Sequence, residues 1–215
     1  MENKNIAIYG AGGLGREILE LINDINSQTH LFHFIGFFDD GIDKGQLVND
    51  YAVLGGMKEL NAWHSNLSLA VAVGSPKTRK DIIEKIVNNY IEYPSLIHPT
   101  VIMGKNDIKI GCGCIICAGN IITTNIKIGD FTILNLGCTV GHDTVIGKYS
   151  SFMPSVNISG EVNIGNSVYV GTGAKIINQL EIGSETIVGA GAVVAKSLPE
   201  RCTAVGVPAK PIKFH

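Results

Sequence analysis

Large apolar residues recur at every sixth position through the second half of the chain. Fifteen consecutive positions follow this spacing: Ile110, Ile116, Ile122, Ile128, Leu134, Val140, Ile146, Phe152, Ile158, Ile164, Val170, Ile176, Ile182, Val188 and Val194. Glycine directly follows many of them, as at Gly111, Gly129, Gly141, Gly147, Gly165, Gly183 and Gly189. Neither a helix nor a single strand has a six-residue period. A triangular coil does, with one hexapeptide per face, the large side chain pointing inward and glycine helping to turn each corner. The pattern therefore predicts about five stacked coils of three hexapeptides each, whose strands pair with those of the coils above and below.

The first half of the chain has a different pattern. Residues 5–9 form an apolar run typical of a buried strand, followed by a helical pattern that continues to about Ile25. Further strands are expected at 34–38 and 67–73, and a helix at 77–90. Alternating strands and helices predict a parallel sheet in a doubly wound α/β unit.

A glycine motif, GAGGLG at 10–15, joins the first strand to the first helix. Such glycines let backbone N–H groups approach a phosphate at a helix N-terminus. Asp39 ends the second strand, where an acid would meet a ribose hydroxyl. Fewer than 100 residues precede the repeats, which leaves room for only half of a dinucleotide fold. This favours a nucleotide-sugar over NAD, and a purely structural glycine turn is the third reading.

Composition and charge exclude several classes of protein. The net charge is -2 and no run of lysines or arginines stands out, which argues against nucleic acid or an anionic membrane as a partner. No apolar stretch approaches the length of a membrane span and no signal-peptide pattern begins the chain, so a cytoplasmic protein is expected. Lys77, Arg79 and Lys80 are expected on a solvated helix face. No metal is expected, because Cys112, Cys114 and Cys117 fall at different phases of the repeat.

One histidine, His142, lies within the regular repeats, at the corner after Val140 and Gly141. An imidazole suits proton abstraction at neutral pH, and Asp143 is placed to orient it. Gly160 follows one 18-residue coil later, so its backbone N–H would lie at the same corner and could stabilise an oxyanion. A surface histidine at a turn is the alternative.

Taken together, the two halves resemble the hexapeptide-repeat sugar acyltransferases of the NeuD/PglD type, which include sialic-acid O-acetyltransferases and nucleotide-sugar 4-amino N-acetyltransferases. The segments that carry the resemblance are GAGGLG at 10–15, FDDG at 38–41, AVGSPKTRK at 72–80, IHPT at 97–100, NLGCTVGHDTVIG at 135–147 and AVGVPAK at 204–210. It implies an N-terminal half-Rossmann domain (1–96) that binds a nucleotide-sugar. It also implies an all-β left-handed parallel β-helix (97–200) and a C-terminal tail (201–215) that contacts coenzyme A.

The resemblance also implies roles for individual residues. His142 and Asp143 match the family's catalytic pair. Substrate contacts are implied for Gly12, Gly13, Leu14, Asp39, Asp40, Gly74 and Asn135. Coenzyme A contacts are implied for Ser151, Gly160, Thr172, Gly189, Ala190 and Lys210. Asn135 could instead belong to an internal asparagine ladder. Leu14 and Ser151 are departures, since some relatives have histidine at each, which leaves the sugar open.

The expected function is acetyl-CoA-dependent N-acetylation of a nucleotide-linked 4-amino-deoxysugar in polysaccharide biosynthesis. His142 would be the general base, and flat β-helix faces would pack into a homotrimer with sites in shared grooves. O-acetylation of sialic acid or another glycan sugar is one alternative. A non-catalytic, nucleotide-binding trimeric scaffold is the other.

Overall fold

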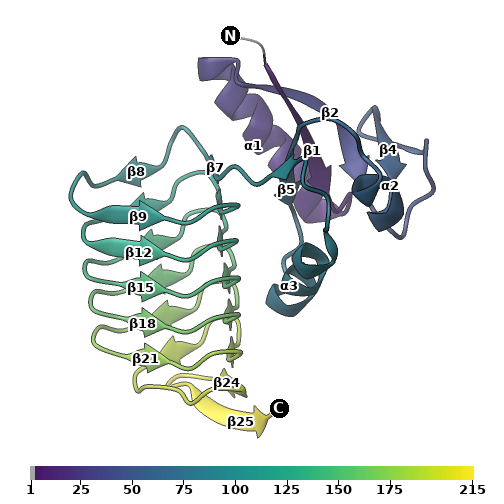
Figure 1. Cartoon of the computed structure of the whole chain (residues 1–215). Helices are drawn as coiled ribbons and strands as arrows, with labels where there is room; N and C mark the ends of the chain where they lie inside the picture. The colour runs from purple at the N-terminus through teal and green to yellow at the C-terminus, as the bar shows by residue number, and fades with distance from the viewer. Residues whose placement is uncertain (1–2) are drawn as a thin grey trace. The chain divides into compact units, whose positions relative to one another are not determined.

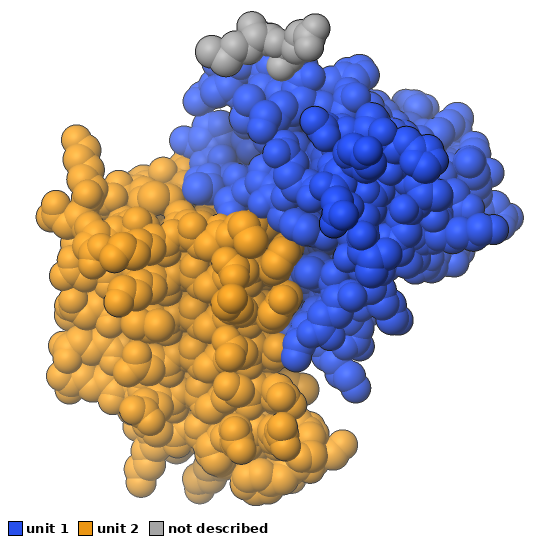
Figure 2. Space-filling model, in the orientation of Figure 1, with its two compact units in different colours: residues 1–99 blue, residues 100–215 orange. Residues whose placement is uncertain are grey.

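A computed structural model describes residues 3–215, and the chain divides into two compact units. The first ends at Pro99 and the second spans Thr100–His215 (Figure 2). The first is an α/β unit and the second a parallel β-helix (Figure 1), as the hydrophobic pattern predicts.

The first unit is built on a six-stranded sheet in the order β3-β4-β2-β1-β5-β6. All neighbouring strands run parallel except β3 and β4. The strands are β1 (Lys4–Tyr9), β2 (Phe32–Phe38), β3 (Leu47–Val48), β4 (Tyr51–Gly55), β5 (Leu67–Val71) and β6 (Ile91–Glu92). The helices are α1 (Gly13–Thr29), α2 (Met57–Asn61) and α3 (Pro76–Lys85), and β7 (Leu96–Ile97) ends the unit.

Helices lie on both faces of this sheet, because β1 is buried on both sides. Ala7 and Tyr9 pack in a cluster with apolar residues of α2 and α3, such as Leu60 and Ile82. Successive strand residues point to opposite faces, so Ile8 faces the other way, toward α1. The doubly wound arrangement is therefore confirmed.

The helix boundaries differ from the expected ones. Helix α1 continues one turn beyond Ile25 and ends before His30, which adopts a left-handed conformation with φ 47°. Helix α3 ends at Lys85 rather than at residue 90. The Asn61 side chain explains this end, since it donates to the Lys85 carbonyl and accepts from the Val87 N–H.

The second unit has three strand-lined faces, and each strand pairs in parallel with the strand 18 residues away. The first face holds β10 (Ile115–Ile116), β13 (Ile133–Leu134), β16 (Ser151–Phe152), β19 (Tyr169–Val170), β22 (Ile187–Val188) and β24 (Cys202–Val205). The second holds β8 (Ile102–Met103), β11 (Ile121–Ile122), β14 (Thr139–Val140), β17 (Asn157–Ile158), β20 (Lys175–Ile176) and β23 (Val193–Val194). The third holds β9 (Ile108–Ile110), β12 (Ile126–Ile128), β15 (Val145–Ile146), β18 (Asn163–Ile164) and β21 (Glu181–Ile182). Strand β25 (Lys210–Phe214) pairs antiparallel with β24 beyond the last coils.

The six-residue repeat fills the interior of this β-helix. Every member of the apolar series from Ile116 to Val194 is buried, and Ile110, at the start, is partly buried. The predicted inward orientation is confirmed.

The role expected for the repeat glycines is wrong. The corners are turned three residues after each large apolar residue, at positions with a left-handed backbone: Asp107, Gly113, Gly119, Asn125, Phe131, Gly137, Asp143, Tyr149, Ser155, Glu161, Ser167, Gly173, Gln179, Glu185 and Gly191. The glycine directly after the apolar residue is needed for close stacking instead. At Gly129, for example, a Cβ would lie 2.6 Å from the backbone nitrogen of Lys148 in the next coil.

Helix length also bears on membrane insertion. The longest helix, α1, has 17 residues, and within residues 3–215 no helix offers the apolar length that a membrane crossing needs.

Candidate active site

The three corners of each coil stack into three edges that run along the β-helix. One edge carries Thr124, His142, Gly160 and Asn178, spaced 18 residues apart, and is called here the His142 edge. Another carries Ala118, Leu136, Pro154, Thr172 and Ala190 and is called the Thr172 edge. The face formed by β14, β17 and β20 separates the two edges within one chain.

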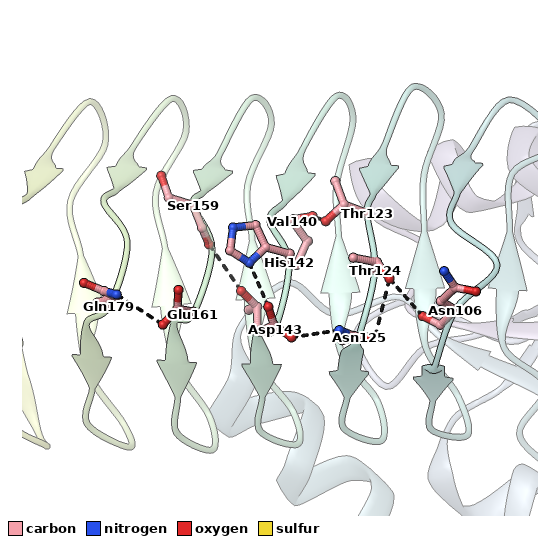
Figure 3. A network of polar contacts seen from close by, with 11 residues as sticks. Asn106, Thr123, Thr124, Asn125, Val140, His142, Asp143, Ser159, Glu161 and Gln179 are labelled. Atoms are coloured by element: carbon pink, nitrogen blue, oxygen red, sulfur yellow. Dashed lines mark hydrogen bonds and ion pairs between the residues drawn. The ribbon is translucent and has the colours of Figure 1, made fainter.

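His142 and Asp143 form a hydrogen-bonded pair on the first of these edges (Figure 3). His142 Nδ1 lies 2.8 Å from Asp143 Oδ2, and 56% of the His142 side chain is exposed. The pair occurs because Asp143 occupies the left-handed corner position, with φ 57°. A carboxylate on Nδ1 keeps the proton on that nitrogen and leaves the Nε2 lone pair free to accept another.

Asp143 is held in its charged form. Its second oxygen, Oδ1, accepts a hydrogen bond of 2.9 Å from Asn125 Nδ2, one coil earlier. The hydrogen bonds from Asn125 and His142 keep the pKa of the Asp143 carboxyl below its usual range. Asn125 was not singled out from the sequence, although subtracting one 18-residue coil from Asp143 leads to it.

Gly160 lies one coil beyond His142, where the imidazole covers it. A Cβ at Gly160 would lie 2.5 Å from His142 Nε2, so only glycine fits this ring position. Among the residues described, no acceptor receives the backbone N–H of Gly160. A base and an unpaired donor therefore lie together, as the 18-residue spacing predicts.

The glycine motif of the first unit also adopts the expected geometry. It follows β1 and opens α1, with Gly12 as the N-cap, and nothing lies within 4 Å of a Cβ placed at Gly12 or Gly13. Asp39 braces this loop: Oδ2 accepts from the Ala11 N–H and Oδ1 from the Gly41 N–H, both at 2.8 Å. An open helix N-terminus beside a carboxylate is thus in place for a phosphate-bearing ligand.

Asp40 is bound by the protein's own groups. The Tyr9 hydroxyl donates to Oδ2, and the Met57 N–H donates to Oδ1 at 2.7 Å. Burial and the neighbouring Asp40 carboxylate raise the pKa of Tyr9 well above its ordinary value. Asp40 therefore ties β1 to the start of α2.

Gly74 lies against Leu14, because a Cβ at Gly74 would be 4.0 Å from Leu14 Cδ2. The carboxyl ends of β1, β2 and β5 thus meet at one edge of the sheet. The expectation that Arg79 is solvated is wrong, since it is only 1% exposed and its guanidinium donates to the Val73 carbonyl. It thereby holds the loop that carries Gly74.

Asn135 is not brought to His142 within the chain. It precedes Leu136 on the Thr172 edge, is 6% exposed, and accepts the Leu136 N–H at 2.7 Å. The asparagine inside the β-helix is Asn120, which sequence reasoning missed. Asn120 is fully buried, and its Nδ2 donates to the carbonyls of Cys117, Leu134 and Asn135.

Most of the expected coenzyme A contacts lie on the surface of the second unit. Thr172 and Ala190 are exposed neighbours on one edge, joined by the Gly191 N–H, which donates to the Thr172 carbonyl at 2.8 Å. Gly189 precedes Ala190 and is partly exposed, and Lys210 is exposed at the start of β25. Ser151 departs from the expectation, because it is fully buried and offers no surface to a cofactor in this structure.

The cysteines form no metal centre in the part of the chain that is described. Across residues 3–215, no three His, Cys, Asp or Glu side chains gather in a group that could hold a metal ion. All five cysteines are free thiols, and the buried Cys114 donates to the Gly129 carbonyl.

The first unit and the whole chain both match known proteins. Residues 5–86 match the family model of the PglD N-terminal domain. Over 153 residues, the chain is 34% identical to GDP-perosamine N-acetyltransferase of Escherichia coli O157:H7, covering 71% of this chain and 69% of the relative. It is 36% identical over 117 residues to UDP-N-acetylbacillosamine N-acetyltransferase of Bacillus subtilis (strain 168), covering 54% of this chain and 52% of the relative.

Solved structures agree with these matches. A histidine-to-asparagine variant of perosamine N-acetyltransferase from Caulobacter crescentus, in complex with CoA and GDP-perosamine, superposes with a TM-score of 0.88 at 29% identity, covering 97% of each chain. The acetyltransferase domain of PglB from Neisseria gonorrhoeae FA1090, in complex with acetyl coenzyme A, gives 0.88 at 31% identity, covering 98% of this chain and all of the other. The expected half-Rossmann unit followed by a left-handed β-helix is confirmed. The chain belongs to the PglD-type family of sugar acyltransferases.

Proposed function

We propose that this protein transfers the acetyl group of acetyl-CoA to the amino group of a nucleotide-linked 4-amino-deoxysugar. The observation that carries the proposal is the His142–Asp143 pair lying over the unpaired N–H of Gly160. The names of the relatives support the substrate class, because both curated relatives are N-acetyltransferases of nucleotide-linked amino sugars.

The chemistry follows from this geometry. The sugar amine attacks the thioester carbonyl carbon as His142 Nε2 accepts a proton from the nitrogen, so a C–N bond forms and the carbonyl oxygen becomes an oxyanion. The Gly160 N–H donates to that oxyanion. The oxyanion then collapses to the amide, the C–S bond breaks, and the CoA thiolate takes the proton from the imidazolium.

The nucleotide half of the substrate would bind at the glycine loop. The N-terminus of α1 favours a diphosphate, and Gly12 and Gly13 leave the backbone accessible. Leu14 and Gly74 would line the same site, with Asp39 bracing the loop and facing the ribose.

Coenzyme A would lie along the Thr172 edge. Positions Gly137, Gly173 and Gly191 leave open space beside Thr172 and Ala190, which suits a thin pantetheine arm. Lys210 would supply a cation for a phosphate. Asn135 is 94% buried beside this edge, and no protein acceptor among the described residues receives its Nδ2 group, so it would donate to the substrate.

The separation of the two edges supports a homotrimer. The proposed base and the proposed cofactor surface of one chain lie on opposite sides of the β14–β17–β20 face. One chain therefore cannot supply both to one groove, whereas the His142 edge of one copy against the Thr172 edge of the next can.

The test is thiol release from acetyl-CoA with UDP-, dTDP- and GDP-linked 4-amino-deoxysugars, with free sialic acid for comparison. Rapid release with one nucleotide amino sugar, lost in His142→Ala, is the expected result. Release with sialic acid alone would establish O-acetylation instead. Absence of release from every acceptor would overturn the enzymatic proposal in favour of a nucleotide-binding scaffold.

A further inference from the structure

Asn125 occupies the corner one coil before the His142–Asp143 pair. Both Asn125 and Asp143 have a left-handed backbone, with φ 55° and 57°. This conformation is one that asparagine and aspartate adopt more readily than most residues. The two backbones are fixed by equivalent bonds to the preceding coil, from Asn125 N–H to the Asn106 carbonyl at 3.0 Å and from Asp143 N–H to the Thr124 carbonyl at 3.1 Å.

The side chains of the two corners are joined as well (Figure 3). Asn125 Nδ2 donates to Asp143 Oδ1 at 2.9 Å, while Asp143 Oδ2 accepts from His142 Nδ1 at 2.8 Å. Each carboxylate oxygen therefore has its own partner, on opposite sides. A carboxylate held at both oxygens cannot rotate away from the imidazole without breaking a hydrogen bond to a charged group.

This restraint matters because the pair is exposed to solvent. Half of the Asp143 side chain and more than half of the His142 side chain are accessible to water. An adjacent aspartate and histidine in water would sample many side-chain rotamers, and only some of them join Nδ1 to the carboxylate.

We propose that Asn125 is a positioning residue that acts on His142 through Asp143. It keeps the carboxylate charged and turned toward Nδ1, so that the imidazole presents Nε2 to the substrate. The inference rests on the proposed function for its effect on turnover. Its effect on the Asp143 carboxyl and the His142 tautomer does not depend on any substrate.

A matched control lies on the same side of the β-helix. Gln179 Nε2 donates to Glu161 Oε2 at 3.2 Å, in the same corner series and also between neighbouring coils. Gln179 likewise has a left-handed backbone, with φ 60°. No hydrogen bond or ion pair joins Glu161 or Gln179 to the His142 side chain within the described residues, so a change here tests amide–carboxylate stacking alone.

The variants are Asn125→Gly, Asn125→Asp and the control Gln179→Gly. Glycine removes the amide without straining a left-handed backbone. Aspartate keeps the shape but cannot donate when ionised, and it repels Asp143. We expect kcat to fall about tenfold in Asn125→Gly and at least as far in Asn125→Asp, with both KM values unchanged, while Gln179→Gly keeps the parent kcat.

The decisive readout is nuclear magnetic resonance of the substrate-free protein. With ¹⁵N-labelled histidine, and His142→Ala to assign the signal, neutral His142 should carry its proton on Nδ1 in the parent chain and in Gln179→Gly. Asn125→Gly should shift the population toward the Nε2–H tautomer and raise the titration midpoint of a ¹³C-labelled Asp143 carboxyl.

An unchanged tautomer and an unchanged Asp143 titration in Asn125→Gly would overturn the inference, even if turnover fell. Failure of the proposed function gives a different pattern. In that case His142→Ala would keep its acetyl-transfer activity, or none would be found in the parent, whatever the spectra of the Asn125 variants showed.

Discussion

The imidazole of His142 lies over Gly160, 18 residues further along the chain. A Cβ at position 160 would be 2.5 Å from Nε2 and 2.6 Å from Cε1 of the ring. The two residues meet because the strands before them, β14 and β17, pair in register one coil apart. The β-helix therefore places the proposed base and the proposed oxyanion donor together through backbone pairing alone.

This relationship makes Gly160→Ala a sharp test of the site. Position 160 has no left-handed backbone, so alanine is tolerated by the main chain, and the exposed imidazole is the group that must move. We expect kcat to fall about a hundredfold, because a displacement near 1 Å misaligns the base. Turnover by thiol release and thermal unfolding measure the two effects.

Asn178→Ala is the matched control for this substitution. Asn178 lies on the same edge, one coil beyond Gly160, and is exposed. It should change neither turnover nor the melting temperature. An alanine at position 160 that left kcat at the parent value would show that the imidazole need not lie where the structure has it.

Asp143→Asn tests the protonation of the ring. The asparagine can donate to Nδ1, which would place the imidazole proton on Nε2, the nitrogen that must accept. We expect kcat to fall about a hundredfold with little change in either KM, since the carboxylate orients the base and need not touch substrate. Steady-state kinetics with each substrate varied in turn would measure this split, and a rise in KM without loss of kcat would contradict it.

The Asp143 carboxyl should also make stability depend on pH. Its pKa is lower in the folded than in the unfolded chain, so its contribution is present above the unfolded pKa and is lost as pH falls through the folded value. Between neutral pH and strongly acidic solution, the free energy of unfolding of the parent should therefore fall further than that of Asp143→Asn. Denaturation at a fixed protein concentration across this range measures the difference, and parallel pH profiles would refute the expected coupling.

Asn120 predicts a different kind of effect, inside the β-helix. Its Nδ2 serves three backbone carbonyls, and its Oδ1 is buried without a partner. Asn120→Asp replaces the donor with a group that repels those carbonyls, and burial should raise the pKa of the new carboxyl. We expect a loss of about 1–3 kcal/mol or more in the free energy of unfolding, growing as pH rises above the ordinary aspartate range.

Chemical denaturation at several pH values would measure this loss. Asn157→Asp is a suitable comparison, since Asn157 lies on the outer side of β17 and is only partly buried. A loss for Asn120→Asp no larger than that for Asn157→Asp would show that the buried amide is dispensable.

The sequence predicts the β-helix and its histidine corner well, for a physical reason. Each coil repeats the same environment, so adding 18 to a residue number locates its neighbour in space, as with His142 and Gly160. The same arithmetic leads from Asp143 to Asn125, but the hydrogen bond depends on side-chain rotamers that a spacing does not contain. Arg79 was misjudged because a charged residue is normally solvated, whereas here backbone carbonyls receive the guanidinium.

The first unit was less predictable in its short elements. Strands β3 and β4 and helix α2 have two to five residues each, too few to show a hydrophobic period. Their positions depend on tertiary bonds such as that from the Met57 N–H to Asp40. Asp40 was expected to meet substrate, and its engagement by Tyr9 and Met57 has no signal in the local sequence.

Subunit complementation tests whether sites are shared between copies. His142→Ala removes the proposed base from one edge, and Ala190→Trp should block the exposed edge proposed for coenzyme A. Each variant alone should be inactive. If a site takes one edge from each of two copies, a mixed trimer contains sites in which both edges are intact.

Random mixing of equal amounts would restore about a quarter of the sites, because each edge is intact with a probability of about one half. Unfolding and refolding the two variants together, followed by thiol-release assays, measures the recovery. The double variant mixed with the parent is the control, since it dilutes intact edges and supplies none. Inactivity of the mixture, with mixed trimers demonstrated by mass, would mean that each chain builds its site alone and that the two edges do not cooperate across copies.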